Sequence, residues 1–564
     1  MKAEGQAHGT PRGLGRLRRL DGAAIFVLAL VVNSLAALFV AQPLYMDAYY
    51  YFDGALQLAR GQGLVEPYLW NYLDPVLRLP HPSHLYWMPL ASLVAAPFIA
   101  LAERLFGPGL APASLFRAAQ VPSVLAASAL PLLSYAAARL ATGRRRHAVV
   151  AALLTIFSAF YLLYWPQTDA FALFALVAAG ALLAAYVGLS RGAGRWLFLG
   201  GLGAGLAHLT RTDGVLVLMV VLAAAVVQAA TSAPRAAGAA GAGRFGGRLT
   251  ASLRPLGLLT GGYLLIMLPW FVRNVFVMGT PLLPGGARLL WLTDYNELYN
   301  YPAEGLTLAH YLAAGWPAIL QAKWSAGVTN FGNVLGPLCN IAAFPFILAG
   351  FWQLRRHALY GLAAVYGGCL FGLMTLVFTL AGARGGFFHS GAALLPFFCP
   401  AAVVGIDAAV EAAARRLPHW QPEKSKPVFN GLLVLVAAGL TARVSWSRMV
   451  GVDWRHPAVA DAVYGEIGRW LDGAAAPGAA VAVNNPPGFF YFTGRPSIVI
   501  PNGAPETLLR AARDFNVRWV ALDANVPAGL AGLYADPASV PHLVLRHTFT
   551  DAAQRAVYVL EVEP

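Results

Sequence analysis

Residues 170–189 read AFALFALVAAGALLAAYVGL, an apolar stretch without a single charged side chain. A helix of about 20 apolar residues is long enough to cross the hydrocarbon core of a bilayer, so this stretch predicts a transmembrane helix. Ten other apolar runs predict the same. They fall at about 23–43, 116–140, 148–165, 195–210, 214–232, 256–273, 331–353, 358–381, 391–410 and 428–446. We therefore expect an all-α polytopic membrane protein with about eleven transmembrane helices.

The composition excludes several classes of protein. Of 564 residues, 58% are hydrophobic and only 12% are charged, whereas soluble domains carry roughly 25% charged residues. The net charge of +14 comes from 40 Lys and Arg against 26 Asp and Glu scattered in short loops, which is typical of the cytoplasmic side of an inner-membrane protein rather than of nucleic-acid binding. The cysteines Cys339, Cys369 and Cys399 lie in apolar segments without metal-ligand spacing, so we expect neither a disulfide framework nor a cysteine metal site.

Basic loops predict the orientation. Arginines precede the first apolar run and no cleavage site follows it, so we expect a signal anchor with a cytoplasmic N-terminus. The stretch 86–106 contains two prolines and two charges and is expected to lie in the interface without crossing. Only then do the later basic loops all face inward. These loops are 144–147, 191–195, 235–254, 355–357 and 415–426. The C-terminus is then extracytoplasmic, and the chain is expected in the inner (plasma) membrane.

The last part of the chain, 450–564, has an ordinary polar composition. VAVNN at 481–485 and RWVALD at 518–523 predict short buried strands, and ETLLRAARDF at 506–515 predicts a helix between them. We expect a transmembrane domain at 1–449, with an outer loop at 44–115, and a small extracytoplasmic α/β domain at 450–564.

This orientation gathers polar residues from the ends of separate spans on the extracytoplasmic face. Each has a simpler explanation taken alone: a carboxylate can cap a helix, an arginine can bind lipid headgroups, and Tyr and Trp form interfacial belts. Arginine is unusual on the outer side, however, and the set as a whole indicates a site. The candidates are Asp47, Tyr50, Asp53, His81, His84, Trp87, Asp169, Arg211, Arg273, Arg384 and His389.

The order of these motifs resembles that of the GT-C glycosyltransferases, integral membrane enzymes that use polyprenyl-phosphate sugars. The resemblance covers about 20–410. It rests on an acidic residue and YY after the first span, GALQLARGQG at 54–63, a YW segment at 86–87, RTDG at 211–214 and PWFVRNVFVMGTPLLP at 269–284. The most similar groups are the protein O-mannosyltransferases and the lipid A aminoarabinose transferases.

The resemblance implies roles for the candidate residues. Asp47 matches the first-loop acidic residue, the general base or acceptor-orienting carboxylate, and Asp169 matches the second-loop acidic residue that positions metal or donor. His81 stands where these relatives have a basic residue near the donor phosphate. By their charge and their side of the membrane, Arg211, Arg273, Arg384 and His389 are the other expected ligands of that phosphate, and Tyr50, Asp53, His84 and Trp87 are expected to line the substrates. This chain has Ala48 after Asp47 where the protein mannosyltransferases have an Asp-Glu pair.

We therefore expect transfer of a single sugar from a polyprenyl-phosphate donor to a glycan, lipid or protein acceptor of the cell envelope. Direct displacement with Asp47 as base would invert the anomeric centre. Membrane lipids are expected partners and nucleic acid is not. Asp47 and Asp169 could hold one divalent cation or none. The alternatives are a membrane transporter or flippase, whose ionisable residues lie near the bilayer midplane, and a polymerase for a lipid-linked glycan.

Overall fold

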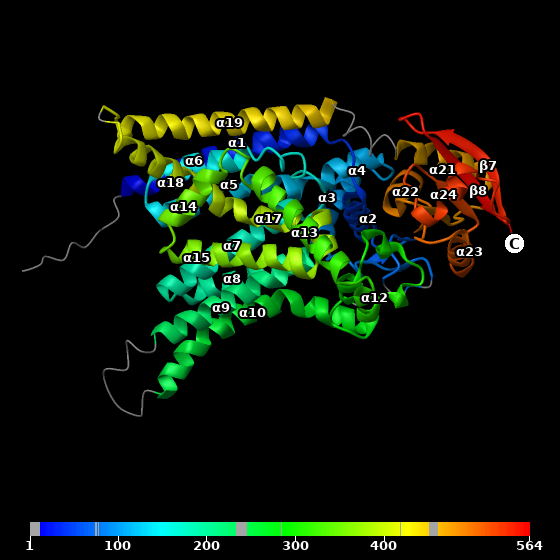
Figure 1. Ribbon diagram of the computed structural model, residues 1–564, viewed down its shortest axis with the longest axis horizontal. Coiled ribbons are helices and arrows are strands. Elements are labelled where there is room, and N and C mark those ends of the chain that lie inside the picture. The colour runs from blue at the N-terminus through cyan, green and yellow to red at the C-terminus, as the bar shows by residue number, and fades with distance from the viewer. Residues whose placement is uncertain are drawn as a thin grey trace, which may run out of the picture.

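The polypeptide forms a bundle of long helices with a small α/β unit at one end, as Figure 1 shows. This computed structural model describes residues 12–73, 76, 78–232, 245–283, 285–417, 419–450 and 461–563. The predicted basic loop at 235–254 and the start of the predicted C-terminal domain, 451–460, therefore lie wholly or partly outside the described residues.

The bundle is built from helices of very different lengths. The α-helices are α1 (Arg12–Phe39), α2 (Met46–Ala59), α3 (Leu90–Phe106), α4 (Pro112–Ala119), α5 (Val121–Thr142), α6 (Arg145–Ile156), α7 (Ala170–Arg191), α8 (Gly194–Thr210), α9 (Val215–Ser232), α10 (Phe245–Met278), α11 (Gly285–Arg288), α12 (Leu308–Ala313), α13 (Trp316–Asn333), α14 (Phe344–Gln353), α15 (Ala358–Gly372), α16 (Thr379–Ala381), α17 (Phe387–Gly391), α18 (Leu395–Ala414) and α19 (Pro422–Val450), followed after the bundle by α21 (Ala462–Ala474), α22 (Pro486–Thr493), α23 (Pro505–Asp514) and α24 (Ala531–Ala535). Short 3-10 and π turns separate several of them, including η1 (Thr212–Gly214), η5 (Tyr295–Tyr299), η7 (Val334–Leu338), η8 (Leu373–Val377) and η9 (Gly382–Gly386).

Eight helical segments in the described part of the chain are long and apolar enough to cross a membrane. They correspond to eight of the eleven predicted runs, so the expected fold class, a polytopic helical membrane protein, is confirmed. The segments are Leu20–Phe39, Pro112–Thr142, Ala170–Arg191, Thr212–Thr231, Leu253–Met278, Ala358–Val377, Thr379–Ala414 and Pro422–Met449.

The other three predicted runs form shorter or interrupted helices. The run 148–165 ends early because α6 stops at Ile156 and the chain turns before Pro166, whereas 195–210 is the 17-residue helix α8. The run 331–353 continues from α13 through the π turn at 334–338 and then breaks at 339–343, where Asn340 and Ile341 have positive φ, before the 10-residue α14 begins. Hydropathy alone does not register such breaks, because most residues of the turns at 157–165 and 339–343 are themselves apolar.

Burial separates the inner helices from the outer ones. In the segments containing α7 and α18, 67% and 78% of the most apolar window is buried inside the protein, against 28% in the segments containing α1, α10 and α19. The latter expose large apolar side chains such as Leu35, Leu265 and Leu435. This pattern places α7 and α18 at the centre and leaves the outer helices to face lipid.

The α/β unit contains a six-stranded sheet in the order β2-β5-β4-β6-β8-β7. The strands are β2 (Tyr68–Leu69), β4 (Val481–Val483), β5 (Ser497–Val499), β6 (Trp519–Leu522), β7 (Leu543–Thr550) and β8 (Ala556–Val562), and a separate pair joins β1 (Val65–Glu66) to β3 (His81–Pro82). Strands β5, β4 and β6 are parallel, whereas β8 and β7 are antiparallel. The two predicted strands, β4 and β6, and the predicted helix, α23, are confirmed. The edge strand β2 comes from the outer loop and pairs with β5 in parallel.

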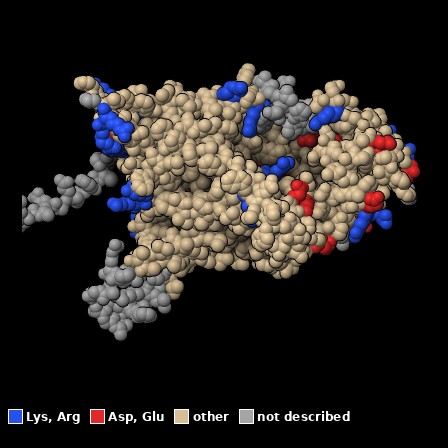
Figure 2. All heavy atoms as spheres, in the orientation of Figure 1, with Lys and Arg blue, Asp and Glu red and all other residues tan. Residues whose placement is uncertain are grey.

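The two ends of the molecule differ in charge. On the face drawn in Figure 2, Lys and Arg form groups at the end opposite to the α/β unit and also lie along the middle of the bundle and on the α/β unit, whereas Asp and Glu are visible only toward the α/β end. At the basic end, buried Asp407 of α18 accepts a hydrogen bond from Asn430 and forms ion pairs with Arg146 and with His147, whose Nε2 lies 2.8 Å from the carboxylate. This cluster ties the α5–α6 corner to α18 and α19.

We predict that the contact between α14 and α18 depends on two glycines. A Cβ atom on Gly350 would overlap the carbonyl of Ala401, and one on Gly405 would overlap the carbonyl of Phe346. Such small residues let helices approach closely. Gly405→Ala is expected to destabilise the fold by about 1–3 kcal/mol, measured by unfolding the purified protein in mixed micelles. Gly368→Ala, where the added Cβ meets open space, is the control and is expected to be neutral or slightly stabilising; equal stability of the two variants would contradict this account.

Candidate functional site

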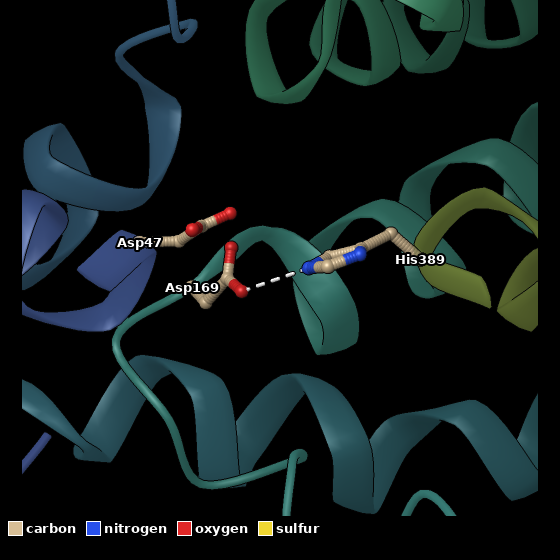
Figure 3. Close-up of side chains that lie close together, drawn as sticks. All are labelled: Asp47, Asp169 and His389. Atoms are coloured by element: carbon tan, nitrogen blue, oxygen red, sulfur yellow. Dashed lines mark hydrogen bonds and ion pairs between the residues drawn. The ribbon is translucent and has the colours of Figure 1, made fainter. Parts of the chain in front are cut away.

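Three side chains from distant parts of the sequence converge at the end of the bundle that bears the α/β unit (Figure 3). Asp47 lies in the first turn of α2, Asp169 immediately precedes α7, and His389 lies in α17. One ligand atom from each lies within 4.8 Å of the other two. Figure 3 shows the carboxyl groups of Asp47 and Asp169 next to each other, with the His389 ring on the far side of Asp169.

Asp169 is fixed by its position at the start of a helix. Its carboxylate accepts the backbone N–H of Ala170 as the N-cap of α7, at the positive end of the helix dipole. The same carboxylate accepts a hydrogen bond from the Tyr45 hydroxyl at 2.9 Å, and His389 Nε2 lies 3.0 Å from it. Asp169 is buried, whereas Asp47 and His389 are partly exposed.

The His389 ring is held on both edges and one face. Its Nδ1 lies 2.9 Å from the carbonyl oxygen of Gly385, and its ring stacks on Phe171 at a centroid distance of 3.7 Å. Both ring nitrogens therefore face oxygen acceptors. An imidazolium ring, which carries a proton on each nitrogen, satisfies both.

The environments of the two carboxylates separate their pKa values. Burial, and then the neighbouring Asp169, raise the pKa of Asp47 to about 7, although His389 and Arg211 act in the opposite direction. Burial would also raise the pKa of Asp169, but the nearby His389 and the hydrogen bonds from His389, Ala170 and Tyr45 lower it. Two titratable groups pushed apart in this way are typical of catalytic sites.

Cationic groups lie around the two carboxylates. Arg211, at the corner between α8 and α9, is close enough to Asp47 and Asp169 to interact with both electrostatically. Arg384 is exposed, and its guanidinium lies 5.3 Å from the ring centroid of Tyr295. Tyr295 and Tyr299 both interact electrostatically with Asp47 and Arg384, so this loop lies beside the site.

The remaining predicted site residues form a second cluster around the middle of α2. The Tyr50 hydroxyl accepts the backbone N–H of His84 at 2.7 Å, and the Tyr50 ring contacts Trp87, which stacks on Trp70 at 3.9 Å. Asp53 is buried on the same helix. Among the described residues, no hydrogen bond or ion pair joins Tyr50, Asp53, His84 or Trp87 to the three side chains of Figure 3.

His81, His84 and Arg273 are tied to the outer loop. The ring nitrogens of His81 lie 2.9 Å from the Tyr68 carbonyl and 2.8 Å from its neighbour Pro82's carbonyl, and Arg273 donates to the Ser83 carbonyl at 2.7 Å. Burial, and then Arg273, lower the pKa of His84 to about 3, so this ring is neutral at neutral pH. The structure therefore places Arg211, Arg384 and His389 on the side of Asp47, and His81 and Arg273 with the second cluster.

No protein-family profile matches the sequence, and no curated protein matches it. Solved structures do match in fold. ArnT from Cupriavidus metallidurans bound to undecaprenyl phosphate is 13% identical, with a TM-score of 0.52 over 96% of this chain and 98% of that one. The apo form of the same protein gives 14% identity and a TM-score of 0.51 over the same shares. The Archaeoglobus fulgidus oligosaccharyltransferase tethered to an acceptor peptide is 13% identical, with a TM-score of 0.50 over 95% of this chain and 74% of that one.

The chain has the GT-C fold. At 13–14% sequence identity, this likeness establishes the fold of the chain. Its chemistry depends on the residues of its own site.

Several residues around Asp47 and Asp169 were not among the predicted ones. Tyr45 lies two residues before Asp47, Ser390 directly follows His389, and Asp213 lies in the RTDG motif. Their closeness in sequence to predicted site residues could have identified these three. Tyr295 and Tyr299 had no such signal, because their loop lies more than a hundred residues from the nearest acidic candidate and reaches the site only through the fold.

The cluster fits a divalent cation by its chemistry. Two carboxylates and an imidazole suit cations such as Mn²⁺ or Zn²⁺. A cation beside Asp47 and Asp169 would also offset the repulsion that raises the pKa of Asp47.

We predict that Mn²⁺ binds the purified protein and that Asp47→Asn, Asp169→Asn or His389→Ala each weakens binding at least about tenfold, because each removes one ligand atom. Electron paramagnetic resonance of free Mn²⁺ measures the affinity. Asp407→Asn is a matched control, because it alters a buried Asp beside a His at the other end of the bundle. Binding that survives all three site variants would show that Mn²⁺ is held elsewhere.

Proposed function

We propose that this GT-C chain is a glycosyltransferase that moves a single sugar from a polyprenyl-phosphate donor to an acceptor in the cell envelope. The observation that carries the proposal is the convergence of Asp47, Asp169 and His389 at one end of the bundle, with Arg211 nearby. The fold supports it, since ArnT of the same fold was solved with undecaprenyl phosphate.

The position of the site suits a lipid-linked donor. Asp169 and Arg211 stand at the ends of candidate membrane spans, where the phosphate of a polyprenyl lipid would lie with its tail in the bilayer. Transfer of the sugar leaves negative charge on that phosphate. Fixed cations at Arg211, Arg384 and His389 would stabilise the developing charge more in the transition state than in the ground state.

Asp47 is the proposed base. The attacking hydroxyl has to lose a proton, and a carboxylate whose pKa is about 7 accepts it well at neutral pH. Asp169 would keep its charge and orient His389. Direct displacement assisted by one base inverts the anomeric centre, and inversion is part of the proposal. A divalent cation, if held by Asp47, Asp169 and a neutral His389, would replace the charge of the imidazolium ring and supply positive charge beside the donor phosphate.

The proposed orientation places the site and the α/β unit outside the cytoplasm, in the inner membrane, with the N-terminus inside. The other end of the bundle supports it, because the face drawn in Figure 2 shows Lys and Arg there without Asp or Glu, and basic residues favour the cytoplasmic side. The α/β unit is proposed to cover the mouth of the site. In support, the backbone N–H of Asn502 donates to the carbonyl of Tyr299, in the loop beside Asp47, at 2.9 Å.

We predict that a deletion strain loses one sugar mass from a single envelope glycan, and that wild type restores it while Asp47→Asn does not, because the amide cannot act as the base. Mass spectrometry of the lipid, polysaccharide and protein fractions, with equal expression confirmed, identifies the acceptor as well. Glu103→Gln, which alters a partly buried carboxyl paired with Arg60, is the control and should restore the glycan. Full rescue by Asp47→Asn would reject Asp47 as base, and an unchanged glycan in the deletion strain would favour the transporter alternative.

We also predict a pH dependence of transfer. The rate is expected to rise with pH and to level off above about pH 7, because only ionised Asp47 accepts the proton. Asp169→Asn removes the neighbouring like charge, lowers the pKa of Asp47 and should shift the residual activity profile to lower pH. Initial rates in membranes on both sides of neutral pH test this; an unshifted profile in Asp169→Asn would contradict the assigned coupling.

A further inference from the structure

Arg211 is anchored by only one edge of its guanidinium group. Its Nε donates to Asp213 Oδ1 at 3.0 Å and to Ser390 Oγ at 2.8 Å, and the Ser390 hydroxyl in turn donates to Asp213 Oδ2. The three side chains form a closed hydrogen-bonded ring. Among the described residues, no hydrogen bond uses the terminal nitrogens of Arg211, which lies in the electrostatic reach of Asp47 and Asp169.

The corner that carries Arg211 and Asp213 is stereochemically constrained. Arg211 leaves α8 in an extended conformation, with φ −150° and ψ 139°, and η1 follows at once. A Cβ atom on Gly214 would overlap the carbonyl of Ala207, so the corner closes only with glycine at that position. The RTDG sequence therefore fixes where the Asp213 carboxylate points.

Asp213 connects two groups of the site at once. Directly it holds Arg211, and through Ser390 it holds the segment that carries His389, the preceding residue. Only 8% of the Asp213 side chain is exposed and Ser390 is fully buried, so water competes little for these bonds.

We propose that Asp213 and Ser390 are positioning residues for the donor phosphate: they fix Arg211 through its Nε so that its terminal nitrogens are presented to the phosphate oxygens. The proposal rests on the proposed function, because it takes the phosphate of a polyprenyl phosphate as the ligand. Arginine suits this arrangement, since its planar fork offers donors on two edges and can be held by one while binding with the other.

A purely structural role is the alternative, in which Asp213 only joins two helices. The Asp407 cluster supplies a comparison, because it is also a buried carboxylate held by arginine and a neighbouring polar side chain, at the opposite end of the bundle. A structural ion pair is expected to change stability alone, whereas a positioning residue changes affinity through Arg211.

The test is binding of undecaprenyl phosphate to the purified full-length chain in nanodiscs, followed by native mass spectrometry. We expect Arg211→Ala, Asp213→Asn and Ser390→Ala each to weaken binding by about tenfold, the typical effect of losing a charge-assisted hydrogen bond. Because Asp213 acts on the phosphate chiefly through Arg211, the loss of binding in the double variant Arg211→Ala/Asp213→Asn should be clearly smaller than the product of the two single losses. Ser390→Thr keeps the hydroxyl and should restore binding, and Asp407→Asn should leave it unchanged.

The outcomes separate this inference from the proposed function. If wild type and Asp407→Asn bind while Asp213→Asn and Ser390→Ala bind equally well, or if the effects of Arg211→Ala and Asp213→Asn add, the positioning role is rejected and the proposed donor stands. If Asp213→Asn fails to fold, Ser390→Ala and Ser390→Thr decide the question. If wild type does not bind undecaprenyl phosphate, the proposed donor is rejected and this inference falls with it.

Discussion

Two carboxylates that meet in a largely dry environment repel one another unless positive charge lies beside them. Asp47 and Asp169 are in this situation, and His389 and Arg211 supply the positive charge. The four groups come from α2, the start of α7, α17 and the α8–α9 corner. Small shifts of any of these elements would change the distances between the four charged groups. The electrostatics of the site therefore constrains how the elements pack at this end of the bundle.

The orientation of Asp47 depends on how α2 is held. On one side the ring of Tyr50 contacts Trp87 of the outer loop at 4.8 Å. On another side the ring of Tyr491, in α22 of the α/β unit, lies 5.1 Å from Tyr49 and 5.4 Å from Phe52. Aromatic contacts of this kind stabilise a fold by burying large apolar surfaces and by the favourable geometry of the ring pairs. The short helix that bears the proposed base is therefore clamped between the outer loop and the C-terminal unit, rather than being an extension of the first membrane span.

Features that depend on adjacent residues could be predicted from the sequence, whereas contacts between residues distant in the sequence could not. Long uncharged runs such as 170–189 predict transmembrane helices, because about twenty consecutive apolar residues match the thickness of the hydrocarbon core. The break at 339–343 is missed because four of its five residues are apolar and only Asn340 is polar. The ends of the predicted spans were enough to select Asp47, Asp169, Arg211 and His389 as candidates. Which of these side chains contact one another could not be predicted. The sequence analysis assigned His81 and His389 the same role. In the structure, His81 contacts carbonyl groups of the outer loop, whereas His389 contacts Asp169.

The pairing of β2 with β5 has a consequence for how the chain can be divided. A strand from the outer loop completes a sheet whose other members all follow residue 480. Tyr72, a little further along that loop, donates its hydroxyl to the carbonyl of Val499. The C-terminal unit is thus not a module that can be exchanged between relatives at a single junction. A functional chimera would have to carry the outer loop together with the tail, and substitutions in these two distant stretches of sequence are expected to depend on one another.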